Sequence, residues 1–193
     1  MPLLLIVATG LLALAIFFPA APSLTLMNTK ASPRGGDFTL QGVAGAVSLS
    51  QFRGQVVLLY FGYTSCPDIC PMSLGVMSTA LAQLSEAEQQ QLQGIFISVD
   101  PGRDSVAILD DYVTYFSPRM LGLTGSADQV AAVARQYGVA YQLGEADASG
   151  NYSVDHASIF HLIGRDGELV EALGHLTTPE VLLRQLRQLL AER

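Results

Sequence analysis

Six consecutive apolar residues, VVLLYF at 56–61, lie in the first half of the chain. A run without polar alternation is typical of a strand that is buried on both faces, in a sheet covered by helices. Apolar positions then recur at spacings of four, three, four and three, which is one stripe of an amphipathic helix: Cys70, Leu74, Met77, Leu81 and Leu84. A second buried run follows at 95–99. The order strand, helix, strand predicts two parallel strands joined by a right-handed crossover.

The remaining segments carry turn, cap and periodicity signals for both helices and strands. They predict a hairpin over 38–49, a helix capped by Asp104 or Ser105, a strand over 120–123, a helix from the capping box Ser126-x-x-Gln129, strands over 157–163 and 169–173, and a last helix from Thr178-Pro179-Glu180. This order predicts an α/β fold. A central mixed sheet is flanked by helices, with an N-terminal hairpin and a helical insertion.

Charge and length narrow the class of protein. The chain has 193 residues, enough for one domain of ordinary size. Its formal net charge is −7, and Lys and Arg form no cluster. Because binding to phosphates needs a basic face, nucleic acid is excluded as a partner.

The N-terminal segment differs in composition from the rest. Residues 1–22 carry no charged side chain, and residues 3–18 form an apolar run. Proline directly after Ala21 makes a poor cleavage site, so an uncleaved signal or membrane anchor over 1–26 is favoured over a cleaved signal peptide. Residues 28–37 are polar, with a proline and paired glycines, and predict a linker over 27–36. The domain is then expected over 37–193.

The chain has only two cysteines, Cys66 and Cys70, in the segment GYTSCPDICP between the buried strand and the helix. On one helix face their backbones would lie about 6 Å apart, which suits either a disulfide or two ligands of one metal ion. A helix N-terminus also lowers the pKa of a thiol, so both thiolates are expected near neutral pH. The alternative reading, two small buried hydrophobic residues, leaves the Pro-Asp pair between them unexplained.

Two thiolates leave a metal ion under-coordinated, and three histidines could supply a third ligand. His156 lies at the predicted entrance of the strand over 157–163, where it would face the cysteines, with Asp155 placed to orient its ring. His161 lies an odd number of positions later, on the opposite face of that strand, and His175 lies at a strand end. His156 is therefore the preferred third ligand.

Three segments together resemble the Sco/SenC family: GYTSCPDICP at 62–71, SVDPGRD at 98–104 and YSVDHAS at 152–158. The resemblance extends from about residue 36 to the C-terminal helix. It implies a thioredoxin-like fold that binds one copper ion, Cu(I) or Cu(II), through Cys66, Cys70 and His156. In the oxidised form Cys66 and Cys70 are expected to form a disulfide.

The same resemblance implies a role in cells. Members of the family help to assemble the copper centre of cytochrome c oxidase, so oxidase subunit II or another copper-accepting protein is the expected partner. Residues 3–18 resemble the single N-terminal membrane anchor that members of this family usually have. The chain is then expected at the bacterial inner membrane, with its domain in the periplasm or on the outer face.

The chemistry of the residues agrees with copper. Soft thiolates with one imidazole suit copper, and a trigonal set suits the cuprous ion. Zinc ranks behind copper because neither a general base nor a substrate pocket is evident. Met72 is a candidate to extend a copper path near Cys70, whereas Met77 belongs to the apolar helix stripe.

Two enzymatic readings compete with a copper chaperone. A thiol–disulfide oxidoreductase, acting on the cysteines of a target copper site, would use Cys66 and Cys70 as a redox pair. The longer Cys-x-x-x-Cys spacing, the absence of Trp and the lack of a proline before Ala157 argue against it. A peroxidase of the peroxiredoxin kind would need Thr three positions before its cysteine, and Thr64 lies two positions before Cys66.

Overall fold

The computed structural model describes residues 35–192. The predicted anchor over 1–26 and all but the last two residues of the predicted linker lie outside them. Among the residues that the structure describes, no helix combines the length and the hydrophobicity needed to cross a membrane. The described residues include the whole of the predicted domain except Arg193.

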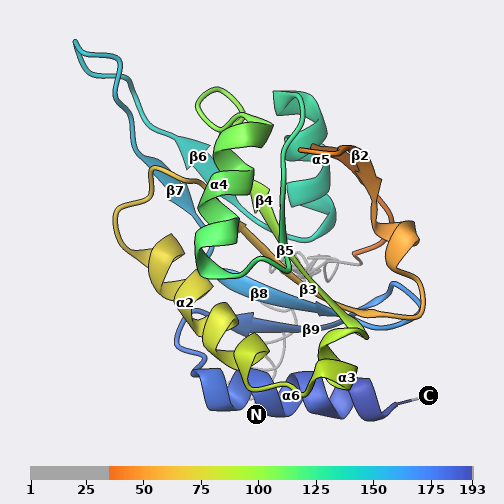
Figure 1. Ribbon diagram of the computed structural model, residues 1–193. Helices are drawn as coiled ribbons and strands as arrows, with labels where there is room; N and C mark the ends of the chain where they lie inside the picture. Colours follow the sequence, from red (N-terminus) through yellow and green to blue (C-terminus); the bar gives the residue numbers. More distant parts are fainter. Residues whose placement is uncertain (1–34, 193) are drawn as a thin grey trace, which may run out of the picture. The chain divides into compact units, whose positions relative to one another are not determined.

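A five-stranded sheet forms the centre of the domain, with the strand order β5-β4-β3-β8-β9 (Figure 1). Its strands are β3 (Val56–Gly62), β4 (Leu92–Ser98), β5 (Met120–Leu123), β8 (Ile159–Ile163) and β9 (Leu169–Gly174). β3, β4 and β5 are parallel, whereas β8 runs antiparallel to β3 and β9 antiparallel to β8. Every residue of β3 is buried, as its uninterrupted apolar run predicts. The predicted mixed sheet is confirmed.

Helices cover both faces of this sheet. α2 (Ile69–Ala82) joins β3 to β4 and α4 (Val106–Phe116) joins β4 to β5, so two right-handed crossovers in the same direction place both helices on one face. α6 (Pro179–Ala191) packs beside α2 (Figure 1). α5 (Ala127–Gln136) lies on the other face. Neighbouring residues of β3 show this, because Gly62 faces Cys70 of α2 whereas Phe61 contacts Tyr137 after α5.

The helix caps follow the sequence signals. Of the two candidates for the start of α4, Ser105 is the cap, and its hydroxyl accepts a hydrogen bond from the N–H of Ile108 at 3.3 Å. Asp104 is buried instead. The capping box before α5 and the proline in the first turn of α6 are both present. Two short helices, η1 (Leu49–Phe52) and α3 (Glu86–Gln89), were not predicted.

Two small antiparallel sheets complete the domain. The predicted early hairpin consists of β1 (Thr39–Gly42) and β2 (Gly45–Ser48). The second pair, β6 (Tyr141–Leu143) and β7 (Val154–His156), was not predicted. The strand predicted over 157–163 in fact begins at Ile159, because His156 pairs with Tyr141 of β6 and not with the central sheet.

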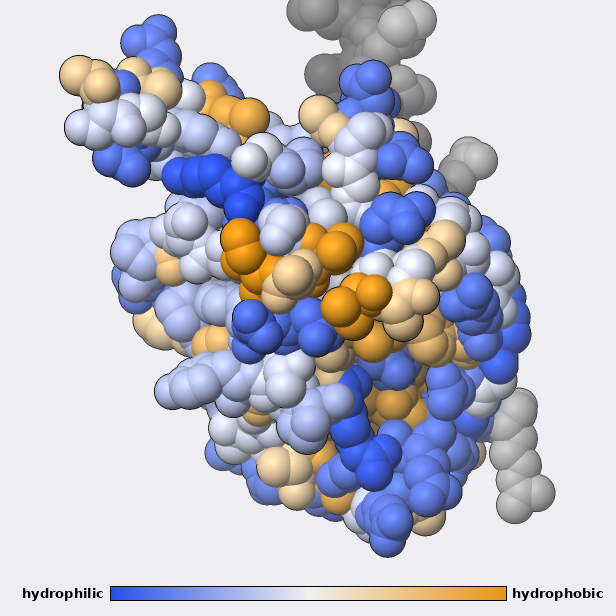
Figure 2. Space-filling view, turned by 45° about the horizontal axis from the view of Figure 1, so that its top comes forward, coloured by the Kyte–Doolittle hydropathy of each residue, from blue (hydrophilic) through white to orange (hydrophobic). Residues whose placement is uncertain are grey.

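The connection between β6 and β7 extends away from the central sheet as an arm (Figure 1). Figure 2 shows the same arm standing out from the surface, with hydrophobic side chains gathered on the face below it. His156 thus comes from a small separate sheet at the base of this arm.

His161 of β8 lies on the face of the sheet that α5 covers, away from the cysteines. It is 1% exposed, between the rings of Phe61 and Tyr137. Its Nε2 donates to the carbonyl oxygen of Tyr137 at 3.1 Å. Burial lowers the pKa of His161 to about 4, so its ring is neutral at physiological pH.

This buried imidazole predicts a dependence of stability on pH. Between pH 6.5 and pH 4 the unfolded chain binds a proton at His161 that the folded chain does not bind, so the free energy of unfolding falls as the pH falls. The contribution of His161 to this loss is about 3 kcal/mol at pH 4. Urea unfolding of wild type and His161→Phe between pH 7 and pH 4 measures it. The difference in unfolding free energy between the two proteins is expected to change by this amount, and a difference independent of pH would contradict the assignment.

Candidate metal centre

Cys70 lies in the first turn of α2, whereas Cys66 lies in the loop before the helix. The prediction that both cysteines share one helix face is therefore wrong. Cys66 precedes Pro67, and a proline disfavours the helical conformation in the residue before it. The helix accordingly begins only at Ile69.

Gly62, the last residue of β3, allows Cys70 to approach the sheet. A Cβ atom at this position would lie 2.7 Å from the Sγ atom of Cys70 and 2.8 Å from the ring of Phe96. Neither separation is compatible with a side chain, because real Cβ atoms do not come so close to other heavy atoms. The absence of a side chain at Gly62 thus makes the space that the Cys70 sulfur occupies.

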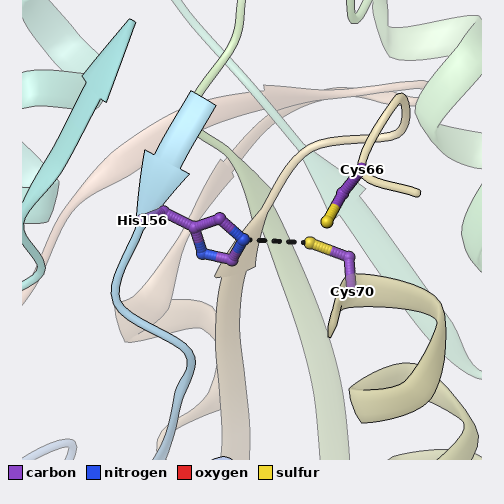
Figure 3. Close-up of side chains that lie close together, drawn as sticks. All are labelled: Cys66, Cys70 and His156. Carbon is purple, nitrogen blue, oxygen red and sulfur yellow. Dashed lines mark hydrogen bonds between the residues drawn. The ribbon is translucent and has the colours of Figure 1, made fainter. Parts of the chain in front are cut away.

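His156, at the end of β7, points toward the cysteines (Figure 3). Its Nε2 atom lies 3.2 Å from the Sγ atom of Cys70. The two sulfurs and one ring nitrogen of His156 all lie within 4.8 Å of one another. Two segments that are far apart in the sequence thus bring together the three donors that the sequence analysis selected.

The hydrogen bonds of the ring determine which nitrogen is available. Nδ1 of His156 lies 3.3 Å from the carbonyl oxygen of Ala157, which can only accept, so Nδ1 carries the proton. Nε2 then has a free lone pair and accepts from the thiol of Cys70. The prediction that Asp155 orients the ring is wrong. Strand alternation turns Asp155 outward into solvent, and the carbonyl group of Ala157 takes its place.

The two thiols differ in acidity. Burial alone would raise the pKa of Cys66, but the backbone N–H groups of Asp68 and Cys70 stabilise its thiolate, and the net pKa is lowered. Burial raises the pKa of Cys70 far above its usual range. The expectation of two thiolates near neutral pH is therefore wrong for Cys70, because the start of α2 does not compensate for its burial. Burial lowers the pKa of His156, which keeps its ring neutral.

The donor set is suited to copper. A metal ion at this place would displace the thiol proton that lies between Cys70 and His156, and would bind both of these atoms together with the Cys66 sulfur. Two soft sulfurs and one imidazole nitrogen form a three-ligand set of the kind that copper prefers. The surroundings are aromatic: the rings of Tyr63 and Tyr60 meet the His156 ring edge-on, with centroids 5.7 and 6.4 Å away.

The loop between β4 and α4 supports the cysteine segment, a role that the sequence analysis missed. Asp104 is 1% exposed. Its carboxylate accepts hydrogen bonds from the N–H and the hydroxyl of Thr64, at 2.9 and 2.5 Å, and from the hydroxyl of Ser98 at 2.6 Å. Thr64 lies two residues before Cys66. The available signal was the second cap candidate: once Ser105 caps the helix, Asp104 is free for another role.

The other candidate residues lie elsewhere. His175 is exposed after β9, and Met72 is 61% exposed on α2; both line a groove between α2 and the connection from β9 to α6. Met77 is fully buried in the core, in agreement with its place in the apolar stripe. Neither methionine belongs to the group formed by Cys66, Cys70 and His156.

Comparison with known proteins gives a consistent result. Residues 27–191 match the family model SCO1/SenC. The mitochondrial SCO2 homologue of Bos taurus is 43% identical over 158 residues, which are 81% of this chain and 59% of that protein. The chain thus spans only about three fifths of the length of this relative.

Two solved structures are also similar. The copper-bound crystal structure of Arabidopsis thaliana ScoI is 34% identical, with a TM-score of 0.75 over 82% of this chain and 99% of that one. The structure of BsSco, described with a disulfide switch, is 26% identical, with a TM-score of 0.64 over 84% of this chain and 96% of that one. BsSco is a member of the Sco family of cytochrome c oxidase assembly proteins. Together with the thioredoxin-like arrangement of sheet and helices, the matched family model over 27–191 means that this chain belongs to the SCO1/SenC family.

Proposed function

We propose that the protein binds one copper ion through Cys66, Cys70 and His156 and transfers it to another protein as cargo. The observation that carries this proposal is the convergence of two sulfurs and a ring nitrogen within 4.8 Å. Three ligands leave the coordination of the ion open, so an incoming ligand from an acceptor can bind before a donor ligand leaves. The copper-bound structure of Arabidopsis thaliana ScoI supports the choice of metal.

Metal analysis of the full chain, purified in detergent, tests this proposal. The reduced protein is expected to retain one copper ion per chain after dialysis against excess copper and removal of free metal. The same treatment with zinc is expected to leave substoichiometric metal, because three protein ligands do not complete a structural zinc site. Retention of zinc in preference to Cu(I) would refute the proposal.

We further propose that the acceptor is the copper site of cytochrome c oxidase, in subunit II or in an equivalent copper-accepting protein. Membership in a family that includes a cytochrome c oxidase assembly protein supports this acceptor. An anchor over residues 1–26 and a linker over 27–36 would hold the domain at the bacterial inner membrane, facing the periplasm or outer side. The uncharged apolar run at 3–18 supports this placement.

Substitution of His156 should weaken copper binding without unfolding the protein. The His156 ring is partly exposed at the end of a three-residue strand, and its removal leaves the central sheet intact. In His156→Ala the affinity for Cu(I) is expected to fall by more than about 10-fold, measured by competition with a cuprous chelator. His175→Ala is the matched control, because His175 is exposed and is not part of the donor group. Equal affinities for wild type and His156→Ala would remove His156 from the ligand set.

A thiol–disulfide oxidoreductase remains the second candidate function, and one observation favours it. The pKa of Cys66 is lowered whereas that of Cys70 is raised, which is the asymmetry that an attacking thiolate and a resolving thiol need. Reduction of a disulfide peptide by wild type and by His156→Ala distinguishes the two functions. Turnover that is independent of His156 and of copper would favour the oxidoreductase.

A further inference from the structure

Arg103 lies in the loop between β4 and α4, which carries none of the three donor residues. Its guanidinium nevertheless joins two parts of the site. Nε forms an ion pair with the carboxylate of Asp100, and Nη1 donates to the carbonyl oxygen of Tyr152 at 2.8 Å. The plane of the guanidinium also covers the ring of Tyr152, with Cζ 3.8 Å from the ring centroid. One side chain thus holds both the backbone and the ring of Tyr152.

Asp100 closes this arrangement into a triangle. It is 1% exposed, and its carboxylate accepts a hydrogen bond from the hydroxyl of Tyr152 at 2.7 Å as well as the contact from Arg103. Its backbone N–H donates to the hydroxyl of Ser98, at the end of β4, at 3.0 Å. The triangle of Arg103, Asp100 and Tyr152 is therefore fixed to the central sheet through β4.

Tyr152 lies two residues before β7, the strand that ends at His156. Among the described residues, β7 forms a backbone ladder with β6 alone, and these two strands form a sheet of their own. β7 is joined to β8 of the central sheet by two residues, Ala157 and Ser158, and its position otherwise depends on side-chain contacts. Arg103 makes such contacts to two residues near His156. Besides Tyr152, it contacts Tyr63: its Cζ lies 5.6 Å from the centroid of the Tyr63 ring, and that ring meets the ring of His156.

We infer that Arg103 is a positioning residue for the metal centre: with Asp100 it anchors Tyr152, and through β7 it places Nε2 of His156 opposite the two cysteine sulfurs. The cysteine segment is held by the hydrogen bonds that Thr64 donates to Asp104, in the same loop as Arg103. The contacts of Arg103 with Tyr152 act on the histidine arm of the site. This inference rests on the proposed copper site and adds the residue that maintains its geometry.

The chemistry of this position is specific to arginine. A planar guanidinium binds a carboxylate, donates to a carbonyl oxygen and stacks on an aromatic ring at the same time. An ammonium group retains the charge next to Asp100 but has no plane to stack on Tyr152. Arg103→Lys therefore keeps the buried carboxylate paired while it weakens the hold on Tyr152. Arg184→Lys is the matched control, because Arg184 is exposed on α6, which carries no donor residue.

The test measures Cu(I) affinity in a double-mutant cycle of Arg103→Lys and His156→Ala, using the full chain in detergent and chelator competition. Arg103→Lys is expected to lower the affinity for Cu(I) by about 10-fold, which is the usual effect of losing a residue that orients a metal ligand. In the His156→Ala background the same substitution is expected to have no further effect. Electron spin-echo spectroscopy of the Cu(II)-loaded protein should show weakened coupling to imidazole nitrogen in Arg103→Lys. Tyr152→Phe, which removes only the hydroxyl bond to Asp100, should give a smaller change in the same direction.

Several results would overturn the inference. An affinity of Arg103→Lys equal to that of wild type, in a protein whose binding depends on His156, would refute the positioning role alone. A loss of equal size in the wild-type and His156→Ala backgrounds would show a general structural effect instead. If Arg103→Lys fails to fold, Tyr152→Phe replaces it in the double-mutant cycle with His156→Ala. Its Cu(I) affinities are then judged by the same criteria. Absence of copper binding in wild type would refute the proposed function and this inference together.

Discussion

Oxidation of Cys66 and Cys70 to a disulfide is expected to abolish copper binding. Both sulfurs of the donor group would then be used in the S–S bond, and only His156 would be left. The affinity for copper is expected to fall by more than about 100-fold. This exceeds the loss caused by removing a residue that only hydrogen-bonds to a metal ligand. Titration of the diamide-oxidised and the dithiothreitol-reduced protein with copper, with free thiols counted in each sample, measures this difference.

The reverse experiment provides the control. Bound Cu(I) is expected to protect both thiols from alkylation, whereas in the metal-free protein the more acidic Cys66 should be alkylated before the buried Cys70. A His175→Ala variant should behave as wild type in both experiments, because His175 is not in the donor group. Stoichiometric copper binding by fully oxidised protein would contradict the assignment of the two cysteines as ligands.

Asp104→Ala is expected to cause the largest loss of stability among the substitutions near the site. It removes three hydrogen bonds to a carboxylate that is 1% exposed, and leaves the N–H of Thr64 and two hydroxyl groups without this acceptor. A loss of about 3 kcal/mol in the free energy of unfolding follows, which corresponds to a decrease in Tm of roughly 10 °C for a domain of this size. Thermal and urea unfolding measure it.

Asp111→Ala is the matched control for this loss. Asp111 is exposed on α4 and undergoes the same change in charge, so its substitution should alter the free energy of unfolding by less than about 0.5 kcal/mol. If both variants lost the same stability, the effect would come from net charge and not from the contacts of Asp104. In Asp104→Ala the segment before Cys66 also loses its anchor, so the affinity for copper should fall together with stability.

The central strands and long helices were predictable because their signals are long. β3 has six consecutive apolar residues, and α2 has an apolar stripe along most of its length. Such patterns determine burial almost without reference to the rest of the chain. The pairing of β6 with β7 was not predictable, since each strand has only three residues, too few for an alternating pattern to be recognised. It depends on contacts between segments that no local pattern contains.

In the metal centre, the identity of the donor residues was predictable from the sequence, but their geometry was not. Cys66, Cys70 and His156 could be selected because thiols and imidazole are rare, reactive groups in this chain. Their surroundings could not be deduced in the same way. The restriction of Cys66 by Pro67 moved it off the helix, and the carbonyl group of Ala157 replaced Asp155 as the partner of the ring. Both outcomes depend on backbone geometry, which a list of residue types does not specify.

The separate sheet of β6 and β7 has a consequence for the metal-bound protein. A metal ion shared by Cys70 and His156 acts as a cross-link between residues 86 positions apart, and fastens the small sheet to the central one. Like other long-loop cross-links, it lowers the entropy of the unfolded chain for as long as the ion stays bound to both residues. Amide hydrogens of β6 and β7 are therefore expected to exchange more slowly in the copper-loaded protein, whereas those of β3 and β4 should be little affected. The loaded and empty proteins would then differ in the rigidity of the small sheet that carries His156, so release of the ion would loosen it.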